Sequence, residues 1–123
     1  SFLPRRQALD AAVESLRDRL AEGLGVATMV GYGPRYLHSV GQLHKGGPDR
    51  TVLLLLTSED AVDIPVPGQP YTFSVLKQAQ ALGDFQALKE RHRRVLRLHL
   101  GHSPEETLPR LLGTIDTLLK RHA

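Results

Sequence analysis

The chain contains no cysteine and no tryptophan, and aromatic residues make up only 5% of its 123 positions. Without thiols it has no disulfide and no cysteine nucleophile, and six histidines without cysteine partners disfavour a structural zinc site. No apolar run reaches the roughly 18 residues that a membrane span needs, and no signal-peptide pattern opens the sequence. These absences predict a cytoplasmic protein that has no metal site and no membrane contact.

Positive charge is in small excess, with 16 basic against 13 acidic residues and a formal net charge of +3. Most basic residues alternate with acidic ones, and only residues 91–94, RHRR, form a compact basic run. Such a run at a helix end is commonly a solvated surface favoured by the helix dipole. Few aromatic side chains are present to stack on bases, so the sequence predicts no nucleic-acid partner, and a basic nucleic-acid-binding domain is kept as an alternative. A mildly basic protein equally suits an anionic small substrate.

Helical and strand-like patterns alternate along the chain. Apolar residues recurring every three or four positions predict helices over 4–24, 35–44, 71–82, 85–92 and from 103 onward. Gly83 and Asp84 are expected to separate the third and fourth of these, and Pro109 to kink the last one. Short apolar runs predict strands over 26–31, 52–57 and 95–100. The residues from 58 to 70 include three prolines and are expected to form a loop.

This alternation predicts the α/β class, with a small three-layer parallel sheet of about three strands and helices on both faces. The run over 52–57, VLLLLT, shows no polar alternation, which indicates a strand covered on both faces. Three strands make a small sheet. Residues 1–123 are therefore expected to form a single segment of a larger α/β domain, or to dock against another domain.

The densest polar segment, residues 33–48, follows the first predicted strand, and open α/β sheets bind ligands at the carboxyl ends of their strands. If residues 35–44 are helical, His38, Gln42 and Lys45 share one stripe. An imidazole, an amide and an ammonium group there could hold a polyhydroxylated anion. The alternative is a capped helix with solvated polar side chains. Lys77 is the single charge in an otherwise uncharged stretch; it is either a surface lysine or a cation positioned near the strand ends.

Two of these segments carry a family resemblance. Residues 31–48, GYGPRYLHSVGQLHKGGP, and residues 67–77, PGQPYTFSVLK, resemble phosphoglucose isomerases, in the form fused behind transaldolase in some bacteria. The block at 79–85, AQALGDF, is similar as well, whereas Val40 and Ser74 depart from the expected threonine and glycine. The resemblance runs from about residue 26 to residue 100. It implies the sugar-isomerase (SIS) fold, of which this chain would be the C-terminal segment.

The resemblance also implies a function, the interconversion of glucose 6-phosphate and fructose 6-phosphate without a metal or organic cofactor. It gives His38 the role of assisting ring opening and places Lys77 near the ring oxygen and the reacting end of the sugar. Arg35, Gln42 and Lys45, in the first block, are the candidate substrate-binding residues.

The family's glutamate base and phosphate site have no counterpart in this sequence, so the chain alone is expected to be inactive. The implied partners are a sugar phosphate, the first SIS domain and a transaldolase domain of the same polypeptide, and a second copy in a homodimer. The alternative within this resemblance is a stand-alone SIS module that binds sugar phosphates without catalysis.

Overall fold

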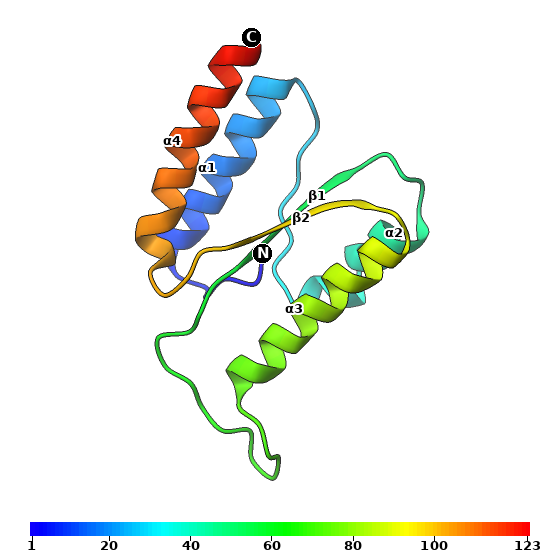
Figure 1. Ribbon diagram of the computed structural model, residues 1–123, viewed down its shortest axis with the longest axis vertical. Helices are drawn as coiled ribbons and strands as arrows, with labels where there is room; N and C mark the ends of the chain where they lie inside the picture. The colour runs from blue at the N-terminus through cyan, green and yellow to red at the C-terminus, as the bar shows by residue number, and fades with distance from the viewer.

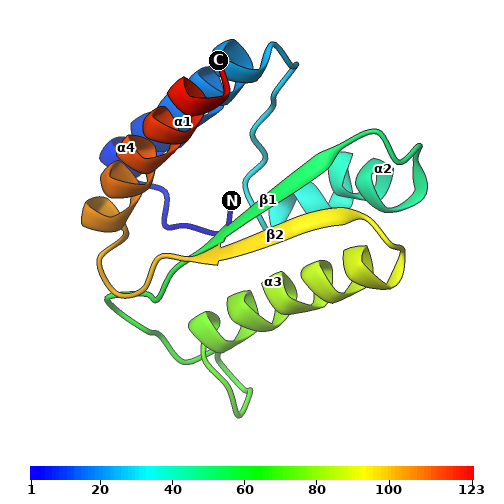
Figure 2. The ribbon, with the colours of Figure 1, turned by 45° about the horizontal axis from the view of Figure 1, so that its top comes forward.

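The computed structural model describes residues 1–123, except for the side chain of His38. Two strands lie at its centre, with helices to either side of them (Figures 1 and 2). In chain order the elements are α1 (Gln7–Leu24), the 3₁₀ helix η1 (Arg35–His38), α2 (Val40–Gly46), β1 (Val52–Thr57), α3 (Phe73–Glu90), β2 (Arg94–His99) and α4 (Pro104–His122).

The two strands are parallel and in register from Val52↔Arg94 to Thr57↔His99. Helix α3 connects them, as a parallel pair requires a crossover connection. The predicted mixed α/β class and the parallel pairing of the second and third predicted strands are therefore confirmed. The segment between β1 and α3 contains an isolated bridge, Pro65↔Thr72, and no further regular element.

Side chains of β1 alternate between two apolar clusters, as the pleat of a strand dictates. Leu56 packs with leucines of α1 and α4, including Leu108, which is fully buried. Leu55 packs instead with Phe2 and with Ala81 of α3. Each leucine buried in this way stabilises the fold by about 1.5–3 kcal/mol. The covering is incomplete at the amino end of β1, where Val52 is 74% exposed, so the expectation of two covered faces holds only for the carboxyl half of that strand.

The predicted strand over 26–31 is wrong, because the first residues of the chain take the place beside β1. The Phe2 N–H donates to the Leu56 carbonyl oxygen at 2.8 Å. On its other side, the Ser1 nitrogen donates to the Gly31 carbonyl at 2.7 Å, and the Gly33 N–H donates to the Ser1 carbonyl at 2.7 Å. The first residues of the chain thus lie between β1 and the run at 26–31, and the sheet has two strands.

The predicted helix over 35–44 is interrupted. Ser39, with φ −139° and ψ −106°, separates η1 from α2. The single stripe of His38, Gln42 and Lys45, which assumed an unbroken helix, is therefore not formed as predicted.

The expected separation of two helices at Gly83 and Asp84 is wrong. Helix α3 continues through Gly83 and Asp84, and α4 continues through Pro109. A proline in a helix removes one backbone hydrogen bond. Buried Leu108 and Leu112 on either side of Pro109 pack in the core shared with α1, which offsets that loss.

Candidate functional site

A hollow of about 260 Å³ lies beyond the carboxyl end of β1, between the loop that follows the strand and the first turns of α3. We call it the carboxyl-end hollow. Its polar lining consists of Asp60, Asp63, Ser74 and Lys77, and its apolar lining consists of Val62, Ile64 and Phe73. This is the edge at which open α/β sheets bind ligands.

Lys77 is held in this hollow by Asp60. Its Nζ donates to Asp60 Oδ1, and Ser74 Oγ donates to Asp60 Oδ2 at 2.6 Å. The side chains of Lys77 and Asp60 are only 20% and 18% exposed. The ammonium group is thus a positioned cation and not the freely solvated surface lysine that the sequence left open.

The start of α3 is fixed beside the hollow. The Thr72 hydroxyl accepts a hydrogen bond from the Val75 N–H at 3.3 Å and caps the helix. The Ser74 N–H donates to Asp63 Oδ1 at 3.0 Å. Hydrogen bonds from the Thr72 side chain, first, and from the Ser74 backbone hold the pKa of Asp63 below its ordinary value. One wall of the hollow therefore carries a carboxylate that stays ionised.

A second polar cluster joins the carboxyl ends of the two strands. Thr57 Oγ1 lies 2.9 Å from His99 Nδ1, and Glu59 Oε2 lies 2.6 Å from His102 Nδ1. Within the described part of the chain, no group of three or more histidine or acidic side chains is arranged to hold a metal ion.

Arg35, Gln42 and Lys45 are not among the residues that line the hollow. The side chain of His38 is outside the described residues. Arg35 and Gln42 are exposed, and Gln42 Nε2 donates to the Leu37 carbonyl at 3.1 Å. Lys45 is 21% exposed, and its Nζ lies 2.8 Å from Asp84 Oδ1. Of the predicted residues with described side chains, Lys77 alone lines the hollow.

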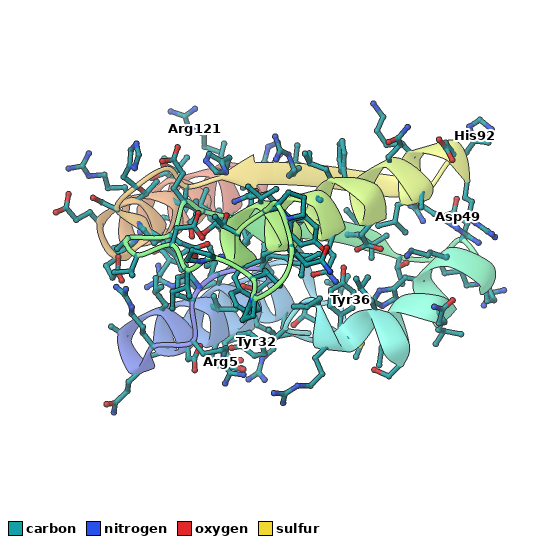
Figure 3. All side chains as sticks on the ribbon, turned by 90° about the horizontal axis from the view of Figure 1, so that it is seen from below. Arg5, Tyr32, Tyr36, Asp49, His92 and Arg121 are labelled. Carbon is teal, nitrogen blue, oxygen red and sulfur yellow. The ribbon has the colours of Figure 1, made fainter. Side chains whose placement is uncertain are left out.

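Asp84 is buried in the middle of α3, where it also accepts a hydrogen bond from the Tyr36 hydroxyl. Figure 3 shows Tyr36 between the segment of η1 and α2 and helix α3. Burial, and then the hydrogen bond to Asp84, raise the pKa of Tyr36 well above its ordinary value. Burial lowers the pKa of neighbouring His44. Asp84 and Lys77 are seven residues apart on α3, about two helical turns, and so share a face of that helix.

The compact basic run is partly engaged within the fold. Arg93 Nη2 donates to the carbonyls of Lys45 and Gly47 at 3.1 and 2.5 Å, and Arg94 Nη2 donates to the Asp49 carbonyl at 3.2 Å. These arginines anchor the end of α2 and the loop before β1.

No helix among the described residues is both long and apolar enough to cross a membrane.

Sequence reasoning missed Asp60, Ser74 as its partner, and the pairing of Asp84 with Lys45. The position of Asp60, three residues after a buried parallel strand, was a usable signal, because ligand-binding side chains concentrate at such ends. Nothing local marks Asp84 as a partner of a residue 39 positions earlier. Comparison of the chain with protein-family models, curated proteins and solved structures finds no match.

Proposed function

We propose that this chain is the C-terminal SIS-type segment of a glucose-6-phosphate isomerase and supplies part of its active site. In this proposal the polypeptide also contains a first SIS domain and a transaldolase domain, and a second copy completes a homodimer. The observation that carries the proposal is the placement of Lys77, a partly buried ammonium group fixed by Asp60 at the carboxyl end of a parallel strand. Its support in sequence is the resemblance of residues 31–48 and 67–85 to phosphoglucose isomerases.

The proposed chemistry uses Lys77 to stabilise the charge that develops as the sugar ring opens. Glucose 6-phosphate is mostly a closed pyranose, so an acid must protonate the ring oxygen while a base removes the proton from O1. A preorganised ammonium group near the ring oxygen stabilises the negative charge that develops there. Asp60 and Ser74 supply the second layer that keeps Lys77 in place.

His38 is the proposed proton shuttle for ring opening. A histidine ordinarily titrates near neutral pH, which suits a group that both gives and takes a proton. The backbone of η1, which carries His38, adjoins α3 through Tyr36 and Asp84, and α3 also carries Lys77. Arg35 and Gln42 are exposed and available as the proposed substrate contacts. The glutamate base and the phosphate site would come from the preceding part of the polypeptide.

The three-layer SIS arrangement is part of the same proposal. Packing of Leu56 with α1 and α4, and of Leu55 with α3, supports a sheet that has helices on both faces. The exposed amino end of β1 and the small size of the sheet are consistent with further strands or a neighbouring domain supplied by the rest of the polypeptide.

A coupled assay with glucose 6-phosphate tests the proposal. The complete polypeptide is expected to form fructose 6-phosphate, and the 123-residue chain alone is expected to show no turnover, because the base lies outside it. Absence of turnover in both directions by the folded complete polypeptide would refute the isomerase function. Turnover by the 123-residue chain would instead refute the division of the site between this chain and the preceding part.

A further inference from the structure

Asp84 is a buried carboxylate that the proposed chemistry does not use. It is 4% exposed, and burying a carboxylate is unfavourable unless it is paired and hydrogen-bonded. Both of its oxygens are engaged by the polar segment that the sequence singled out. Oδ1 pairs with Lys45 Nζ at 2.8 Å, and Oδ2 accepts the hydrogen bond of the Tyr36 hydroxyl.

Tyr36 is closely packed by its neighbours. A Cβ added at Gly31 would lie 3.2 Å from Tyr36 Cβ, and one at Gly41 would lie 3.0 Å from the Tyr36 carbonyl oxygen. The ring meets Phe2 edge-on, with centroids 5.8 Å apart. Gly31 and Gly41 therefore allow the backbone to pack closely against Tyr36, whose hydroxyl donates to Asp84.

The end of the same segment is held independently. Arg93 donates to the carbonyls of Lys45 and Gly47, so α2 is fixed at its carboxyl end as well as through Asp84. Lys45 faces Asp84 and does not line the carboxyl-end hollow. In this position the ammonium group of Lys45 holds α2 against α3, and it is not placed to bind a ligand in the hollow.

We propose that Asp84, Tyr36 and Lys45 form a positioning clamp, which holds residues 35–46 against α3 and so sets the place of His38 relative to Lys77. In this inference, which rests on the proposed isomerase function, Lys45 acts through Asp84 and does not touch the substrate. The sequence had assigned Lys45 to substrate binding, and the two roles predict different kinetics.

A double-mutant cycle in the complete polypeptide separates these roles. Lys45→Met and Asp84→Asn are each expected to lower kcat by on the order of 10–10²-fold with little change in KM, since misplacing a catalytic group by about 1 Å has an effect of that size. The double variant should be no worse than the poorer single variant, because each change removes the same contact. Lys120→Met, an exposed lysine on α4, is the matched control and should leave kcat unchanged.

Two milder variants keep the test decisive if Lys45→Met or Asp84→Asn fails to fold. Lys45→Arg keeps a cation opposite Asp84 and should restore most of kcat. Tyr36→Phe removes one hydrogen bond but keeps the ring and should lower kcat per folded molecule with KM unchanged. If Tyr36→Phe lowers only the melting temperature and leaves kcat per folded molecule intact, the clamp is merely structural and the inference is overturned.

Other outcomes also decide the matter. A KM raised tenfold or more by Lys45→Met, with kcat kept and with effects that add to those of Asp84→Asn, would place Lys45 on the substrate and overturn the clamp. Wild-type polypeptide without turnover would refute the proposed function itself, which distinguishes the two failures.

Melting temperatures of the same variants test the contact between Lys45 and Asp84 without reference to activity. The losses should be strongly non-additive, and additive losses would show that Lys45 and Asp84 are uncoupled.

Discussion

Replacement of His38 by alanine in the complete polypeptide is expected to lower kcat for glucose 6-phosphate by on the order of 10²–10⁴, with KM nearly unchanged. Removal of a general acid–base group has an effect of this size. Ring opening needs a group that exchanges protons near neutral pH, which an ordinary histidine supplies and the Gln42 amide or the Ser39 hydroxyl does not. Phosphate binding, in the proposed arrangement, rests on residues outside this chain, so binding should be spared. Steady-state kinetics on the variant measures both quantities.

The decisive comparison for His38 uses an open-chain substrate analogue. If His38 opens the ring, the loss should shrink when ring opening is bypassed. Equal losses with closed and open substrates would move its role to the later proton transfer or to packing. A structural histidine would instead lower the melting temperature and leave turnover per folded molecule nearly intact. His122→Ala, at an exposed position near the end of α4, is the matched control and should change neither.

The second large effect is expected at Lys77. Lys77→Met should lower kcat by on the order of 10²–10³, the loss typical of removing one preorganised group that stabilises developing charge. Methionine keeps most of the length and apolar stem of lysine, so the change is mainly the loss of the ammonium group. Asp60→Asn should give a smaller loss, because it loosens Lys77 but leaves the cation present. The kcat values of Lys77→Met and Asp60→Asn are measured with the coupled assay on folded protein.

The control for Lys77 lies on the same helix. Lys89 is exposed, with its Nζ 5.6 Å from the centre of the Phe85 ring, and Lys89→Met should leave kcat unchanged. If Lys77→Met and Lys89→Met behave alike, the hollow is not part of the active site. A Lys77→Met variant that is less stable but fully active per folded molecule would assign the Lys77–Asp60 pair to folding alone.

Features set by local sequence were the predictable part of this fold. The apolar runs at β1 and β2 and the helical periodicity of α1 and α4 determine which elements form. Left-handed Gly25, with φ 64°, ends α1 as its sequence position indicates. Parallel pairing follows because a long helix connects the two strands.

Features set by distant partners were not predictable. The run at 26–31 has the composition of a strand, but Ser1 and Phe2 occupy the hydrogen-bonding position beside β1. Gly83 and Asp84 have the local character of a helix break. Burial of Asp84 against Lys45 and Tyr36 overrides it, and α3 runs through. In both cases tertiary contacts outweigh local preference.

The residues of the candidate site were likewise predictable only in part. Lys77 could be singled out because a lone charge in an uncharged stretch is visible in sequence, but its partner Asp60 lies 17 positions earlier and emerges only from the fold. Lys45 was singled out in the sequence as a candidate substrate-binding residue. Its engagement with Asp84 depends on how α2 packs on α3, which no spacing within residues 33–48 encodes.

The most direct test of the central claim is a crystal structure of the complete polypeptide with an open-chain hexose 6-phosphate analogue. We predict that the reacting end of the analogue, at C1 and C2, lies in the carboxyl-end hollow within hydrogen-bonding distance of Lys77 Nζ. The phosphate should lie on residues that precede this chain. An analogue bound with its reacting end remote from Lys77, or bound without contact to any residue of this chain, would contradict the account.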